Sequence, residues 1–225
     1  MAENRCVAEK YVDCINNVLI YGIFESDFEY SHRFAEGNFY KTRVRVARLS
    51  GTEDCVPIVI PEALINDIKT QAVKGKRVEI GGQFRSYSQP IWSDKKFLEL
   101  FVFVTSIRID EDDDGDGETD SQRDYNGVIM EGYVCRPTVY RLTPFGREIT
   151  EIKLVVRRGF GKSDFIPCIT WGKIAQNAKI LETGDKIRLN GRIQSRQYAK
   201  YFSDSGKDEI RTTYEVSISS FTKVN

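Results

Sequence analysis

Apolar and polar residues alternate along several stretches of the chain, most clearly over residues 186–200. One side of this stretch carries Ile187, Leu189, Gly191 and Ile193. The other side carries Arg188, Asn190, Arg192, Gln194, Arg196 and Tyr198. Because side chains alternate between the two faces of a β-strand, the pattern predicts a strand with one apolar face. Its other face is lined with arginines and ends in an aromatic ring.

The second half of the chain contains further segments of this kind. Strands are predicted at about residues 127–140, 147–157, 164–171, 186–200 and 209–221. A short helix is predicted between the third and fourth strands, where Ile174, Ala178 and Leu181 have the spacing of one apolar helical stripe. Five strands with one helix in about 100 residues are typical of a small closed barrel of the OB type.

The first half repeats this order of elements. Three blocks recur in the same sequence: residues 17–22 as 126–132, 54–59 as 164–169, and 74–80 as 183–189. The offset between the two copies is nearly constant, which indicates a tandem duplication. We therefore predict an all-β chain with two tandem OB-fold barrels, each with five strands and one helix between strands three and four.

The net charge of zero hides an uneven distribution of charge. Residues 110–125 hold 1 basic and 9 acidic residues, whereas residues 126–225 hold 17 basic and 10 acidic residues. A like-charged block rich in Gly and polar residues does not collapse, and it is typical of a flexible linker. The predicted domains are residues 1–109 and 126–225, joined by the acidic linker at residues 110–125.

Composition excludes several classes of protein. The chain of 225 residues is 40% hydrophobic and 29% charged, which is ordinary for a globular protein. No apolar run reaches the roughly 18 residues of a membrane span, and residues 1–13 lack the apolar region of a signal peptide. The five cysteines never form C-x-x-C, which argues against a disulfide framework or a zinc site. We predict a cytoplasmic protein with reduced thiols.

Motifs for catalysis or metal binding are incomplete. Residues 159–163, GFGKS, look like the end of a P-loop, but Val156 stands where a glycine is required. An EF-hand-like start at Asp110 fails at Ser121, where a bidentate Glu is needed. His32 has no cysteine nearby and lies among aromatic residues, which favours a packed hairpin. We expect no catalytic residue, no cofactor and no metal.

The second half carries motifs of a known family. WGKIA at residues 171–175 and GRIQSR at residues 191–196, together with NGV at 126–128 and DFIP at 164–167, resemble the bacterial single-stranded DNA-binding protein (SSB) family. The resemblance covers almost all of residues 126–223, and the first half is similar only through the internal repeat. It implies an OB-fold that wraps single-stranded DNA without reading its sequence. Because the family works as a set of four barrels, it also implies a homodimer.

The resemblance also implies a set of DNA-binding residues. The family's stacking positions fall on Phe160, Phe165, Trp171 and Tyr198. The basic residues interleaved with these rings are Arg157, Arg158, Lys162, Lys173, Arg188, Arg192 and Arg196. Rings stack on bases and cations contact phosphates, so together they predict a DNA-binding groove. Structural interpretations stay open: Trp171 as a core residue, Phe165 on the face shared by Pro167 and Ile169, and the arginines as a solvated face.

The first half departs from this pattern. The four stacking positions correspond to Ser50, Cys55, Pro61 and Gln89, none of which is aromatic. Tyr87 and Trp92 lie close to these positions in the sequence and are the candidate substitutes. We predict a division of labour in which the second barrel binds DNA tightly and the first mainly packs, pairs or binds weakly.

The sequence therefore predicts a non-enzymatic protein that coats single-stranded DNA in replication, repair or recombination. Replication proteins are the expected partners, and the protein is expected to be encoded by a bacterium, a phage or a mobile element. Members of the family usually end in an acidic tail, whereas here the acidic run lies between the barrels. It either competes with DNA for the groove or keeps the barrels apart. The alternative function is a primosome or replication scaffold component that acts mainly through protein contacts.

Overall fold

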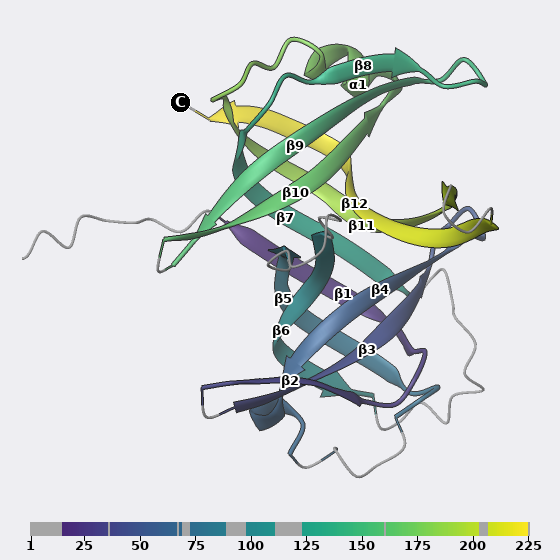
Figure 1. The fold of residues 1–225 in the computed structure, drawn as a ribbon, viewed down its shortest axis with the longest axis vertical. Coiled ribbons are helices and arrows are strands. Elements are labelled where there is room, and N and C mark those ends of the chain that lie inside the picture. Colours follow the sequence, from purple (N-terminus) through teal and green to yellow (C-terminus); the bar gives the residue numbers. More distant parts are fainter. Residues whose placement is uncertain are drawn as a thin grey trace, which may run out of the picture.

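The structure of the chain is a computed structural model, drawn as a ribbon in Figure 1. It describes residues 15–35, 37–66, 68, 73–88, 98–110, 123–159, 161–202 and 207–224. At residues 88, 198–202 and 207–211 only the backbone is described. Most of the predicted acidic linker, residues 111–122, lies outside the described residues.

Six strands in the first half form a closed barrel. They are β1 (Asn16–Phe24), β2 (Glu29–Phe34), β3 (Gly37–Ala47), β4 (Glu53–Pro61), β5 (Arg77–Ser88) and β6 (Leu98–Ile109). β1 closes the barrel by pairing with β3, and β4 runs parallel to β6. The short 3-10 helix η1 (Glu62–Leu64) follows β4. Without β2, the five other strands follow the order of an OB barrel. β2 is an additional strand that forms a hairpin with β3.

The second half repeats this barrel. Its strands are β7 (Tyr125–Val134), β8 (Val139–Leu142), β9 (Glu148–Arg158), β10 (Lys162–Trp171), β11 (Lys186–Phe202) and β12 (Lys207–Val224). β7 pairs with β9, and β10 runs parallel to β12. Helix α1 (Gly172–Ala178) follows β10. The prediction of two tandem OB-fold barrels is confirmed.

Two local details differ from the prediction. The predicted strand at residues 127–140 ends at Val134, and the chain then turns into the separate strand β8. Pro137 lies in this turn and has no N–H to donate to a strand ladder. The predicted apolar stripe of the helix is also wrong in part. Ala175 and Ala178 are the buried residues of α1, whereas Ile174 is only half-buried.

The alternation in β11 builds the core of the second barrel. Ile187, Leu189 and Ile193 are fully buried, as the apolar face predicts. The register shifts at Asn190/Gly191, where a β-bulge bends the strand. A Cβ at Gly191 would lie 2.5 Å from the Ser217 carbonyl oxygen, so only glycine fits this close approach. The bend closes the barrel over its apolar side chains.

The two barrels are joined by their first strands. β1 and β7 run antiparallel and pair from Asn16 opposite Met130 to Tyr21 opposite Tyr125. Figure 1 shows them side by side in the middle of the molecule, with one barrel above and the other below. The pairing makes one continuous sheet of twelve strands from the described residues. Neither first strand leaves an exposed edge.

Two equivalent contacts join the barrels on either side of this seam. At the Asp164 junction, the backbone N–H of Ser86 donates to Asp164 Oδ1 at 2.8 Å. At the Asp54 junction, the N–H of Ser195 donates to Asp54 Oδ1, also at 2.8 Å. Each aspartate lies in one barrel and its donor in the other. The residues correspond by the offsets of the sequence repeat, so an approximate twofold axis relates the two barrels.

Candidate nucleic-acid interface

Phe165 lies on the outer face of β10. Ile166 and Cys168 point into the core, so the alternation of the strand turns Phe165 outward, where it is 42% exposed. It pairs with Val155 of β9, and the Lys153 ammonium lies 5.7 Å from the centre of its ring. This arrangement offers an exposed aromatic face next to a cation.

Trp171 is the last residue of β10. Its backbone is extended, and the chain turns at Gly172, whose φ is +54°, into α1. The residue is 38% exposed, so its ring is available at the surface. The neighbouring Ile169 is buried, which separates Trp171 from Phe165 along the strand. The two rings therefore mark two places on one strand.

The other two predicted stacking residues are Phe160 and Tyr198. Phe160 lies outside the described residues. The backbone of Tyr198 is described and pairs with Arg211 in the β11–β12 arm. Their participation in a groove with Phe165 and Trp171 stays a prediction.

Five of the predicted basic residues are exposed: Arg157, Lys162, Lys173, Arg188 and Arg196. The Arg157 guanidinium lies 5.1 Å from the ring centre of Tyr133 on β7. Lys162 reaches across to the first barrel, where its ammonium lies 5.7 Å from the ring centre of Phe34. Arg157 on β9 and Lys162 on β10 lie on the same pair of strands as Phe165, whereas Lys173 lies on α1 and Arg196 on β11. Exposed cations of this kind are available to phosphates.

Three of the predicted basic residues, the exposed Arg188 among them, face carboxylates. Arg158 Nε lies 3.5 Å from Asp164 Oδ2, and Arg192 Nε lies 4.0 Å from Asp54 Oδ2. Arg188 Nε donates to Glu131 Oε1 at 2.6 Å. Burial raises the pKa of Glu131, but hydrogen bonds from Lys186 and Arg188 outweigh it and hold that pKa below the ordinary value. Arg158 and Arg188 thus pair with carboxylates of neighbouring strands in the second barrel, and Arg192 pairs with a carboxylate of the first barrel.

The first barrel has different chemistry at the position of Phe165. Cys55 stands there, half-buried, and its thiol donates to Glu25 Oε2 at 2.7 Å. Burial, followed by the contact with Glu25, raises the pKa of Cys55 to about 12. Pro61 ends β4 where Trp171 ends β10. The outer face of β4 thus carries neither of these two rings.

The first barrel nevertheless has aromatic residues that the sequence comparison missed. His32 stacks on Phe39 with ring centres 4.9 Å apart, and Phe39 lies 6.0 Å from Phe103. The Arg85 guanidinium lies over the Phe103 ring, 3.7 Å from the ring centre. Alternation in β6 could have placed Phe103 outward, because Val102 and Val104 are apolar inward neighbours.

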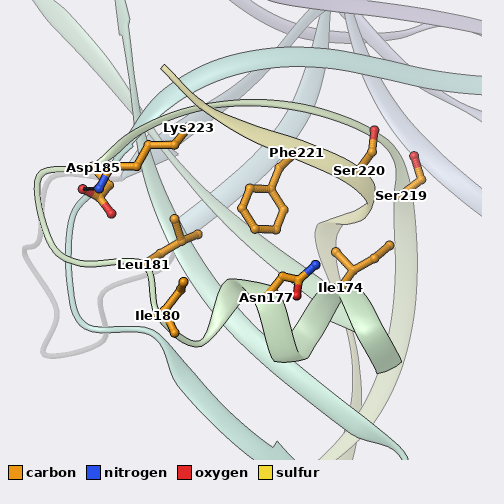
Figure 2. A pocket seen from close by; sticks show the side chains of 9 residues that line it. All are labelled: Ile174, Asn177, Ile180, Leu181, Asp185, Ser219, Ser220, Phe221 and Lys223. Carbon is orange, nitrogen blue, oxygen red and sulfur yellow. Dashed lines mark ion pairs between the residues drawn. The ribbon is translucent and has the colours of Figure 1, made fainter. Parts of the chain in front are cut away.

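A separate groove of about 430 Å³ lies beside α1 and is lined by four apolar and five polar or charged residues (Figure 2). Figure 2 shows the Phe221 ring above the helix, with Leu181 and Ile174 on either side. Lys223 at its rim is paired with Asp185, 2.6 Å between Nζ and Oδ1. Without a free cation next to a ring, this groove lacks the chemistry of the β10 face.

Within the described ranges, no helix is long and apolar enough to cross a membrane.

Known proteins with similar sequences match the second barrel. The model of the single-strand binding protein family matches residues 125–223. The single-stranded DNA-binding protein of Clostridium tetani is 32% identical over 99 residues, 38% of this chain and 68% of that protein. That of Halalkalibacterium halodurans is 36% identical over 80 residues, 32% of this chain and 48% of that protein. The chain thus spans about half the length of several curated relatives that it matches.

Solved structures match both barrels. The wild-type single-stranded DNA binding protein from Thermus aquaticus superimposes with a TM-score of 0.71 at 16% identity, over 95% of this chain and 94% of that chain. A deletion mutant of the same protein gives 0.71 at 18% identity, over 95% and 96%. At this identity the likeness shows the fold alone, and the sequence matches supply the family. The chain belongs to the single-strand binding protein family.

Proposed function

We propose that this chain binds single-stranded DNA without sequence specificity, mainly on the outer face of β9 and β10. The exposed Phe165 ring beside the Lys153 ammonium is the observation that carries the proposal. A base stacked on such a ring contributes about 1–3 kcal/mol whichever base it is. Trp171 offers a second ring at the end of the same strand. The protein acts by binding and not by catalysis.

Exposed cations supply the second part of the interaction. Arg157, Lys162, Lys173 and Arg196 contact phosphates, and each contact releases counterions. Arg158, Arg188 and Arg192 contribute less because carboxylates already face them. Binding is therefore salt-dependent, with a slope set mainly by Arg157, Lys162, Lys173 and Arg196. Such coating protects single strands in replication, repair or recombination.

The proposed organisation of the protein has two features that do not involve DNA, namely its domains and its homodimer. The domains are residues 1–109 and 126–225, with the acidic segment between them. A second copy of the chain pairs through the outer face of the sheet at β1 and β7, giving four barrels. In support, Leu19 and Ile129 occupy equivalent positions on this face and are 46% and 47% exposed. An exposed aliphatic pair on a broad sheet is typical of an interface.

A titration tests the proposal. Labelled oligo-dT is added to the full chain at low and at high salt, and binding is followed by anisotropy and by quenching of tryptophan fluorescence. We expect binding that weakens steeply with salt. Phe165→Ala weakens it by about one stacked base. The matched control is Phe145→Ala, because Phe145 is a phenylalanine that is 92% exposed, in the β8–β9 turn, and is not one of the predicted stacking residues. Absence of binding at micromolar DNA would refute the proposal.

The scaffold function remains the second candidate, because the second barrel exposes apolar residues outside the β10 face. These are Leu142, Phe145 and Ile180. A scaffold would bind a replication protein with the same affinity whether or not Phe165 is replaced. Loss of partner binding in Phe145→Ala with DNA binding intact would favour this function.

A further inference from the structure

The two junctions between the barrels are equivalent in backbone but not in side chains. At the Asp164 junction, the N–H of Phe165 donates to Ser86 Oγ at 2.8 Å, so Phe165 lies against β5 of the first barrel. The next outward residue of β5 is Tyr87, which is exposed. At the Asp54 junction, Cys55 takes the place of Phe165, and its N–H lies 3.4 Å from Ser195 Oγ. Only the first of the two junctions has rings on both sides.

The rings of the first barrel continue from Tyr87 across the outer surface. Arg85 and Phe101 lie opposite each other on β5 and β6. The Arg85 guanidinium lies over Phe103, Phe103 contacts Phe39, and His32 stacks on Phe39 with an angle of 9° between ring planes. These side chains form a row over β5, β6, β3 and β2. His32 is exposed, and the others are half-buried.

The fold does not require this row. In the second barrel, the strand register places Gln194 and Glu215 at the positions of Arg85 and Phe101. Ser217 occupies the position of Phe103. Ile169, the counterpart of Val59 beneath the row, is still buried there, at 6% against 7% exposure. An OB barrel of this sequence type therefore closes and covers its core without the rings.

We propose that a single DNA strand crosses between the barrels over the Asp164 junction, passing from Phe165 to Tyr87, Phe103 and the His32–Phe39 stack. At the Asp54 junction Cys55 and Arg196 stand in place of Phe165 and Tyr87, so no base stacks there. This inference rests on the proposed function and names the part of the first barrel that takes part in it. The DNA bases stack on the exposed rings of Tyr87 and His32 and on the Arg85 guanidinium that lies over Phe103.

Charge favours the same route. Arg85 Nε and Nη2 donate to Gln83 Oε1 at 3.2 and 2.7 Å, which holds the guanidinium over Phe103. The stacked guanidinium keeps its charge, so Arg85 presents a planar cation to a nucleotide. Lys162 joins the two barrels at Phe34 and adds a second cation. Two carboxylates oppose the route: Glu99 lies opposite Tyr87, and Glu29 pairs with Lys41 at 3.8 Å. Their negative charges repel phosphates, which confines the DNA strand to the row of rings between them.

The test uses the full chain and a length series of fluorescein-labelled oligo-dT. Tyr87→Ala removes one exposed ring, and Phe103→Leu replaces a ring by an apolar side chain of similar size. We expect the double variant to bind the longest oligonucleotide at least about fivefold more weakly, and to reach its affinity plateau at a shorter length. Phe145→Ala is the matched control and stays within about twofold of wild type. Circular dichroism checks that each variant is folded.

Photocrosslinking with 4-thiothymidine in the oligonucleotide maps the route in the unsubstituted chain. We expect adducts near Phe165 and in the peptides that contain Tyr87, Phe103 and His32. Adducts confined to the second barrel, or adducts around Cys55 at the other junction, would overturn the inference. A double variant within about twofold of wild type at every length would also overturn it. If the wild-type chain binds no oligo-dT at all, the proposed function fails instead.

Discussion

Asp164 is the residue whose substitution tests how the barrels are held together. Its carboxylate is 1% exposed and accepts the Ser86 N–H from the other barrel at 2.8 Å. Asp164→Ala removes this acceptor and leaves a buried N–H without a partner. Asp164→Asn keeps an oxygen acceptor of the same shape but removes the charge. Comparison of the two variants separates the hydrogen bond from the charge.

The structure sets the expected magnitudes. An unsatisfied buried donor costs about 1–3 kcal/mol, so Asp164→Ala lowers the free energy of unfolding by about 2 kcal/mol. Asp164→Asn costs less than about 1 kcal/mol, because Asp164 Oδ2 has no hydrogen-bond partner to lose. Arg158, the cation nearest to it, is 29% exposed and turns to water when the charge is removed. Asp164→Asn is therefore expected to be nearly as stable as wild type, and Asp164→Ala is expected to be the least stable of the three.

Urea unfolding followed by circular dichroism measures these differences. Asp54→Ala at the equivalent junction is the comparison variant: it also loses a 2.8 Å bond from a backbone N–H, and in addition the hydrogen bonds from Arg48, so its loss is expected to be larger. Equal losses for Asp164→Asn and Asp164→Ala would refute the reasoning, because the charge and not the Ser86 bond would then hold the junction. A loss below about 0.5 kcal/mol in Asp164→Ala would refute it as well.

The same residue predicts a dependence on pH. Burial raises the pKa of Asp164, and the Ser86 N–H, Arg158 and Arg85 only partly offset it. A carboxyl whose pKa is higher in the folded state than in the unfolded state costs stability as pH rises through that interval. The cost begins near the ordinary value of about 3.8 and is complete above the folded pKa. Asp164→Asn lacks this step, so relative to wild type it gains stability as pH rises from about 3.8 through the folded pKa of Asp164.

Three further predictions concern single residues. Trp171→Ala weakens oligo-dT binding by about 1–3 kcal/mol while the circular dichroism spectrum keeps its barrel signal; an unfolded spectrum would show that the ring is structural. Iodoacetamide at about pH 8 leaves Cys55 and Cys168 unmodified in the folded chain, because burial raises the pKa of both thiols; modification at the rate seen in urea would contradict this. Gly191→Ala lowers the free energy of unfolding by about 1–3 kcal/mol, since the new methyl group meets the Ser217 carbonyl; thermal melts that coincide with wild type would refute this close approach.

The barrels could be predicted because strand alternation is local. Ile187, Leu189 and Ile193 follow the period of two residues, and their burial confirms the predicted apolar face of β11. The same period turns Phe165 outward, so its exposure follows from its neighbours Ile166 and Cys168. The repeat then carried the second-half prediction to the first half.

The missed features depend on residues that are far apart in the chain. Arg188 and its acceptor Glu131 are 57 positions apart, and they meet only because β11 pairs with β7. The row from His32 to Arg85 likewise forms only after the first barrel closes, since its members come from four strands. Strand β8 was missed for a local reason, because the break before it depends on a turn and not on hydrophobicity. Alternation gives the face of each residue but not its neighbours on other strands.

The pairing of β1 with β7 has a consequence for how such a molecule can change over time. Two identical chains related by an exact twofold axis carry every substitution twice, once on each side of the axis. Here each related position has its own codon, because both barrels lie in one chain. A change at Cys55 leaves Phe165 untouched, and the two sides of the molecule can be inherited as different surfaces. One open reading frame thus encodes two different surfaces on the two related barrels, whereas a gene for a single barrel encodes the same surface in every copy.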